Sequence, residues 1–185
     1  INRMFPNLDH IFAGWEQDLF GCQPALLFAK AMPWAVVSEL MSMGYFMYYP
    51  MKAAVVLYYF FCRYYEAERV SFVLLASFFI YYLIYIYVPV VGPTFYLDAV
   101  GVQDIAKGIF PAMGDYFSTH TSCLPTPGYT DGIFYQLVED AKEAGERPTA
   151  AFPSSHVGVS TICMLLAWHS RNRKLLFIML PFYPF

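Results

Sequence analysis

Charged side chains are scarce in this chain. They make up 14% of its 185 residues, whereas soluble domains have roughly 25%. Hydrophobic residues account for 58% and aromatic residues for 20%. A soluble domain of this length has too little interior to bury so many Phe, Tyr, Ile and Met side chains. The shortage of charge therefore excludes an ordinary soluble domain and predicts an integral membrane protein.

An excess of basic residues is also missing, because the net charge is −3. Nucleic-acid-binding domains are usually strongly basic, so the sequence predicts no nucleic-acid partner. His, Cys and carboxylate residues nowhere follow the spacing of a metal site. We therefore expect neither a metal nor another cofactor.

Long uncharged runs predict membrane-spanning helices. Residues 70–91 hold 22 residues without a charge, roughly 33 Å of helix against a hydrocarbon core of about 30 Å. Residues 36–62 are apolar apart from Glu39 and Lys52. This run is too long for one straight span, so we expect one helix kinked at Pro50. Two short helices with a turn at Pro50 are the alternative.

Two further apolar runs complete the expected membrane domain. Residues 152–169 form a short span, and residues 175–185 begin another. Residues 1–32, with an amphipathic stretch over 8–20, are expected to lie at the interface. Together they predict an all-α fold, a polytopic transmembrane helical bundle forming a single domain. Because residues 175–185 are too few to cross, and the chain begins with Ile1, we expect it to be a fragment of a longer protein.

The basic residues near the spans suggest how the chain is oriented. They lie in two short connectors and are Arg63, Arg69, Arg171, Arg173 and Lys174. The positive-inside rule makes these connectors cytoplasmic, so the long loop 92–151 faces outward. The expected location is the cytoplasmic (inner) membrane. Cys22 and Cys123 then both lie outside, where oxidising conditions permit a disulfide.

The outer loop is expected to contain short amphipathic helices. Residues 98–109 read as a helix capped by Asp98. Residues 131–144 read as a second helix, with Asp131 as its N-cap and Gly145 as its stop. The second helix is expected to lie on the membrane or over a pocket.

The most informative stretch follows this loop, at residues 152–156. Pro153 punctuates the loop, and Ser154 is a suitable N-cap for a helix over 157–168. Free amide groups at the helix start, with two hydroxyls and the imidazole of His156 beside them, form an anion site with a proton donor. At a membrane surface, this favours chemistry on a phosphate carried by a lipid. The alternative is a capped helix with a solvated His156.

Pro153, Ser154, Ser155 and His156 resemble the second motif of the type 2 phosphatidic acid phosphatase superfamily. That superfamily also includes vanadium haloperoxidases and lipid phosphotransferases. The resemblance implies that His156 protonates the leaving group while Ser154, Ser155 and backbone amides hold the phosphate. Ala151-Phe152 and the segment 91–97 are more similar to the inositol-phosphoceramide-synthase-like branch.

The first motif of the superfamily is Lys, six residues, then Arg-Pro. Arg147-Pro148 is similar to its end, but the residue seven places before Arg147 is Asp140, and Lys142 is out of register. Arg147 is still a candidate phosphate ligand. The alternative is an ion pair between Arg147 and Glu143 or Glu146.

The third motif supplies the nucleophilic His of the superfamily. Ser170-Arg171 is similar to its start, but Phe177 stands where that His would be. We expect the missing His and Asp to lie beyond Phe185. Residues 1–185 are then expected to lack the nucleophile.

Several other side chains are weaker candidates. A carboxylate within a membrane span is often functional, which makes Glu39 a candidate. Thr94 and Tyr96 begin the outer loop and are candidates, with Glu39, for a headgroup pocket. His120 is more simply a solvated loop residue.

The sequence favours a metal-independent phosphatase that hydrolyses a phosphomonoester or pyrophosphate of a membrane lipid. The site would face the outer leaflet, and the resemblance implies a phosphohistidine-type mechanism. One alternative is a phosphotransferase that moves a phosphoinositol-type headgroup to a lipid acceptor. The other is a non-enzymatic transporter or structural subunit, for which Glu39 and the Pro50 kink are the support. The expected partners are the lipid substrate and the bilayer.

Overall fold

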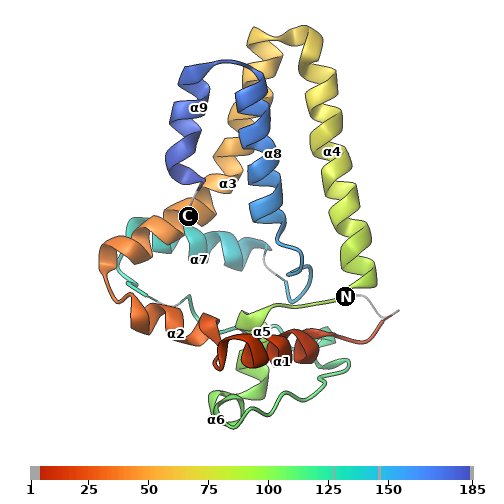
Figure 1. Ribbon diagram of the computed structural model, residues 1–185, viewed down its shortest axis with the longest axis vertical. Coiled ribbons are helices and arrows are strands. Elements are labelled where there is room, and N and C mark those ends of the chain that lie inside the picture. Colours follow the sequence, from red (N-terminus) through yellow and green to blue (C-terminus); the bar gives the residue numbers. More distant parts are fainter. Residues whose placement is uncertain (1–4, 127, 146, 184–185) are drawn as a thin grey trace.

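The computed structural model describes residues 5–126, 128–145 and 147–183, and over these ranges the chain is all-α with no strand. Figure 1 shows the arrangement. The longer helices are α3 (Ala35–Cys62), α4 (Tyr64–Tyr87) and α8 (Ser155–His169). The short elements α9 (Arg173–Met179) and η2 (Leu180–Phe182) follow α8. The remaining elements are α1 (Asp9–Phe20), α2 (Pro24–Ala31), α5 (Pro93–Val100), α6 (Val102–Ala106), η1 (Tyr116–Ser118) and α7 (Ile133–Gly145). The all-α prediction is confirmed.

The long helices form one bundle, and the short helices α1, α2, α5, α6 and α7 gather at and below one end of it (Figure 1). The bundle core contains Val55, Tyr59, Leu74, Val159 and Cys163. The Tyr59 hydroxyl donates a 2.9 Å hydrogen bond to the Leu166 carbonyl, which ties α3 to α8. This packing fixes the height at which α8 begins, and therefore the position of the predicted motif.

Helix α3 runs without interruption through Pro50, so the structure has one helix where the two-helix alternative places a turn. Helix α4 begins at Tyr64, earlier than the uncharged run, and includes Arg69 in its first turns. Within the described ranges, α4 is the one helix long and apolar enough to cross a membrane by length and composition. Several crossings therefore stay a prediction.

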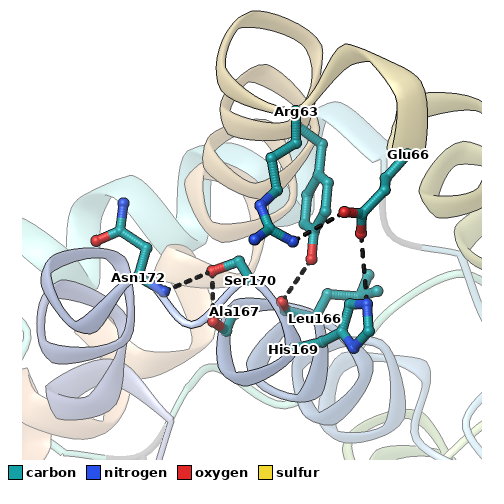
Figure 2. A network of polar contacts seen from close by, with 8 residues as sticks. Arg63, Glu66, Leu166, Ala167, His169, Ser170 and Asn172 are labelled. Atoms are coloured by element: carbon teal, nitrogen blue, oxygen red, sulfur yellow. Dashed lines mark hydrogen bonds and ion pairs between the residues drawn. The ribbon is translucent and has the colours of Figure 1, made fainter.

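The two basic connectors lie at the same end of the bundle, away from the short helices (Figure 1). Figure 2 shows the contacts that join them. Arg63 Nη1 lies 2.8 Å from Glu66 Oε1, and His169 Nε2 lies 3.4 Å from Glu66 Oε2. In the second connector, the Asn172 amide donates to the Ser170 hydroxyl, which itself donates to the Ala167 carbonyl. These contacts fasten the start of α4 to the end of α8.

The helix predicted over 98–109 is wrong in its bounds. Helix α5 begins at Pro93, whose missing N–H and fixed φ suit the first helical position, so Asp98 lies inside it. Gly101 then ends α5 with φ +86°, a left-handed conformation that favours glycine, and α6 follows. The amphipathic prediction over 8–20 matches α1 closely.

Helix α7 agrees with its predicted range within two residues, but Asp131 is not its N-cap. The helix begins at Ile133, and the Gly132 carbonyl accepts the Gln136 amide at 3.1 Å. The first amides of α7 are instead satisfied by the Glu39 carboxylate of α3. A cap from another helix leaves no local sequence signal, which is why the pattern pointed to Asp131.

Candidate active site

The predicted motif forms the start of α8. Ser154 is the N-cap, and its hydroxyl accepts the Val157 amide at 3.4 Å, while Ser155 is the first helical residue. The carbonyl of Pro153 accepts the Tyr85 hydroxyl of α4 at 3.0 Å, which fixes the preceding loop. The first amide groups of α8 thus lie at a defined position with positive partial charge.

A cavity of about 500 Å³, called the phosphate cavity below, lies at this helix start. It brings together predicted residues that are distant in sequence, namely Thr94, Arg147, Ser154, Ser155 and His156. Its other lining residues include Tyr45, Tyr49, Gly92 and Lys142. The candidate phosphate ligands and the candidate proton donor therefore share one concave site.

Aromatic rings of α3 hold the imidazole of His156. The Tyr45 ring stacks on it with centroids 4.4 Å apart and an interplanar angle of 17°. The Tyr48 ring lies 4.2 Å away, and the Tyr49 ring packs edge-on at 6.3 Å. His156 Nε2 is buried without a hydrogen-bond partner in the part of the chain that the structure describes. The imidazole is half-buried and clamped rather than freely solvated.

Helix α7 brings a lysine to the cavity. Lys142 Nζ donates to the Thr126 hydroxyl and lies 3.2 Å from Glu139 Oε1, and Thr126 also donates to Glu139. Partial burial alone would raise the pKa of Glu139, but the hydrogen bond from Thr126 and the Lys142 ammonium outweigh it and hold this pKa below its ordinary value. Glu139 is therefore ionised near neutral pH and forms an ion pair with Lys142.

Arg147 lies in the connection between α7 and α8 and is exposed at the cavity. The structure has no ion pair between Arg147 and Glu143, both of which it describes. The other predicted partner, Glu146, lies outside the described residues. Arg147 is thus placed where a bound anion would meet it.

A family model for the PAP2 superfamily, the type 2 phosphatidic acid phosphatases, matches residues 11–185. The chain belongs to the PAP2 superfamily. This confirms the family expected from the Pro-Ser-Ser-His motif, while the inositol-phosphoceramide-synthase-like branch stays a prediction. No curated protein and no solved structure matched the chain. Since PAP2 proteins are generally phosphatases with lipid substrates, membership indicates an enzyme of the phosphatase type.

Two headgroup candidates lie outside the phosphate cavity of this PAP2 chain. Tyr96 is 1% exposed, and its hydroxyl donates to the Pro111 carbonyl at 2.9 Å. Burial, with a smaller contribution from Asp9, raises the pKa of Tyr96 to about 12, so the phenol stays neutral. Glu39 accepts the amides of Phe134 and Tyr135 at 3.2 and 3.1 Å. Both side chains support the fold around the site, and only Thr94 of this group lines the cavity.

Asp9 is a supporting residue that the sequence pattern did not reveal. Its buried carboxylate accepts the Val91 amide at 2.8 Å and the Gly92 amide at 2.9 Å, and burial raises its pKa. Gly92 has φ +97°, and a Cβ there would lie 2.9 Å from the Ala151 Cβ. Asp9 therefore holds a cavity wall in a conformation that needs glycine. An acidic residue opening an amphipathic helix was its only sequence signal.

The remaining candidates lie apart from the cavity. His120 is exposed and stacks on Tyr116 with centroids 4.1 Å apart, as a solvated loop residue can. No disulfide joins Cys22 to Cys123, so the expected bridge is not present in the structure.

Proposed function

We propose that this PAP2 chain is an integral membrane phosphatase that removes phosphate from a lipid phosphomonoester or pyrophosphate. The observation that carries the proposal is the single cavity into which Ser154, Ser155, Arg147 and His156 converge. Each of these groups has a distinct task in cleaving a phosphate ester.

Binding a phosphate dianion requires positive potential. The amides at the start of α8 supply it together with the Arg147 guanidinium, and Lys142 adds to it from α7. The hydroxyls of Ser154 and Ser155 are further hydrogen-bond donors. Because the α8 amides are fixed by the helix before the substrate arrives, they stabilise charge that develops in the transition state.

We assign to His156 the donation of a proton to the leaving alcohol or phosphate oxygen. Its Nε2 carries no competing hydrogen bond from the described residues, and the rings of Tyr45 and Tyr48 restrict its orientation. The phosphoryl group would pass to a histidine of the type that the family resemblance implies, and water would then release phosphate.

The outer surface of the bundle supports a membrane location. Helix α4 exposes a row of large apolar side chains: Phe72, Leu75, Phe79 and Leu83 are each 57–70% exposed. On α8 and α9, Leu165, Trp168, Phe177 and Ile178 are exposed to a similar degree. Apolar surface of this extent needs a partner, and a bilayer is the one that fits all sides of a helical bundle. The proposed site faces outward, opposite the basic connectors.

The test is phosphate release from phosphatidic acid and from a lipid pyrophosphate by the full-length protein in proteoliposomes. His156→Ala should lower kcat by about 10²–10⁴-fold, the usual contribution of a general acid. Arg147→Ala should also weaken binding of inorganic phosphate, followed by ³¹P NMR. His120→Ala is the matched control, because His120 lies on the outer loop that also carries Arg147 but outside the cavity. Its rate of phosphate release and its phosphate binding should equal those of the unsubstituted protein.

Retention of full phosphate release in His156→Ala would contradict the role proposed for His156. If the unsubstituted protein converts neither lipid, the proposed function is wrong and a non-enzymatic role is favoured. A parallel reaction with phosphatidylinositol and a lipid alcohol separates hydrolysis from group transfer. If the phosphoinositol group passes to the lipid alcohol with release of diacylglycerol, and no free phosphate forms from phosphatidic acid or the lipid pyrophosphate, the phosphotransferase alternative is correct.

A further inference from the structure

A second cavity, called the chain pocket below, adjoins the phosphate cavity. It has a volume of about 350 Å³, within the range of small-molecule sites. Its apolar walls come from Phe28 of α2, Met32 directly after α2, Val37 and Met41 of α3, and Val138 of α7. None of these residues lines the phosphate cavity.

The two cavities share three lining residues, Tyr45, Thr94 and Lys142. The two cavities therefore meet at these three residues. The polarity of the lining changes across these shared residues. Lys142 and Thr94 offer polar atoms at the border, and beyond them the walls are apolar side chains of three helices.

Two polar side chains of the chain pocket are already engaged. The Ser38 hydroxyl accepts the Tyr129 amide at 2.9 Å, and the Thr126 hydroxyl bonds with both Glu139 and Lys142. A sugar or inositol placed there would lose its hydration and gain few hydrogen-bond partners in return, which is unfavourable. A hydrocarbon chain would lose nothing by entering.

The edge of the chain pocket meets surface suited to lipid. Phe28 and Met32, which line the pocket, are 43% and 44% exposed, and the neighbouring Trp34 and Val36 are 66% and 70% exposed. These residues lie on the segment that leads from α2 into α3. Trp is typical of the membrane–water interface, where the phosphate and the first carbons of a lipid chain also lie.

We propose that the chain pocket holds the first part of the hydrocarbon chain of the lipid whose phosphate occupies the phosphate cavity. This inference rests on the proposed function and makes it more specific. The enzyme then recognises a lipid phosphate at two points, by charge at α8 and by apolar burial between α2, α3 and α7. It should discriminate against phosphate esters without a long chain.

The experiment compares two substrates, long-chain phosphatidic acid and a water-soluble phosphatidic acid with four-carbon chains, in the full-length protein. Met41→Trp fills the chain pocket without touching the phosphate cavity. It should raise KM for the long-chain substrate at least tenfold and leave KM for the short-chain substrate within about twofold. Met47→Trp, on the same helix but outside both cavities, is the matched control and should change neither value.

A second measurement needs no variant. Long-chain phosphatidic acid with a photoreactive diazirine on its first chain carbons is cross-linked to the unsubstituted protein in proteoliposomes. Labelling should fall on peptides of α2, α3 and α7 that contain Met32, Met41 or Val138. Excess inorganic phosphate should weaken this labelling, because it competes for the phosphate cavity and so displaces the lipid that occupies both cavities.

The outcomes separate the two proposals. Equal losses for both substrates in Met41→Trp, or labelling confined to other helices, would overturn the chain pocket while leaving the phosphatase proposal standing. If the unsubstituted protein hydrolyses neither substrate, the proposed function fails. The cross-linking pattern then decides the chain pocket independently.

Discussion

The imidazole of His156 owes its position to aromatic packing. Tyr45 and Tyr48 come from α3 and enclose the ring, and Lys52 places its ammonium 3.6 Å from the centroid of the Tyr48 ring. Aromatic pairs contribute about 0.5–1.5 kcal/mol beyond the area they bury. Holding a proton donor in one orientation matters because proton transfer depends steeply on geometry.

Replacing Tyr48 with Leu should therefore reduce catalysis without abolishing binding. The loss of about 1.4 kcal/mol of orienting contact corresponds to roughly a tenfold drop in kcat. KM should change little, because the α8 amides and Arg147 remain. Tyr48→Phe retains the ring and should stay near the unsubstituted rate. Steady-state phosphate release measures both, and an equal loss in Tyr48→Phe would shift the role to the phenol hydroxyl.

Gly158 is required where α8 crosses α4. A Cβ at this position would collide with the Tyr81 side chain, whose Cζ would lie 2.7 Å away. Gly158→Ala should thus lower the free energy of unfolding by about 1–3 kcal/mol through overpacking. Thermal unfolding in detergent measures the change. Gly14→Ala is the matched control, since nothing lies within 4 Å of its Cβ position in α1, and it should be neutral or stabilising.

The sequence predicted the chemical groups of the site better than their surroundings. The cap and the imidazole of the α8 motif are local, so pattern and spacing were sufficient for Ser154 and His156. The enclosing Tyr45 and Tyr48 lie more than a hundred positions earlier in the sequence, and nothing in a tyrosine-rich helix marks which rings will meet a histidine. Asp9 was missed for the same reason, because its partners are amides of a distant segment.

At the scale of elements, α7 is the piece whose placement decides the electrostatics of the site. It carries Lys142, and Arg147 follows its end. Glu39 anchors its first turn, and Gly132 lies so close to Glu39 that no Cβ would fit between them. Glu39, a functional candidate because it is a charge within an expected span, has a structural role in these contacts. The carboxylate compensates the N-terminus of a helix that covers the cavity.

Removing this anchor should loosen α7 selectively. Loss of a capping side chain costs about 1–2 kcal/mol, so amide hydrogen exchange over residues 133–137 should accelerate roughly 5- to 30-fold in Glu39→Ala. Exchange in α8 should remain unchanged. Glu39→Gln still accepts hydrogen bonds but lacks the charge, and it should give an intermediate rate. Equal exchange in all three proteins would show that α7 is held by its apolar face alone.

Element boundaries followed from the sequence where helix ends are set locally. Helix α7 ends at Gly145, as the predicted stop signal indicated, and α1 ends at a left-handed Gly21. The start of α5 was misplaced because the sequence offers two equally good starts. Asp98 is a good N-cap, and Pro93 is a good first helical residue. Contacts with Asp9 at the preceding Gly92 settle the choice, and these are tertiary.

At the scale of the whole molecule, the two ends differ in charge and in content. One end joins α3 to α4 and α8 to α9, and the Arg63–Glu66–His169 contacts fasten it (Figure 2). The other end carries the short helices and the phosphate cavity (Figure 1). Since basic connectors favour the cytoplasm, this separation supports a site on the outer face.

Labelling of single cysteines in cells tests this orientation. Cys62 is exposed at the basic end, and Cys163 has 0% exposure in the core. Two proteins are compared, each with Cys22 and Cys123 changed to serine. The first keeps Cys62. The second replaces Cys62 with serine and carries Glu143→Cys on the exposed surface of α7. A membrane-impermeant maleimide should label the α7 cysteine in intact cells, because that end lies outside. It should label Cys62 only after permeabilisation, while Cys163, present in both proteins, gives the unlabelled baseline.

Labelling of Cys62 in intact cells, with the α7 cysteine protected, would place the phosphate cavity in the cytosol and overturn the outer-leaflet assignment.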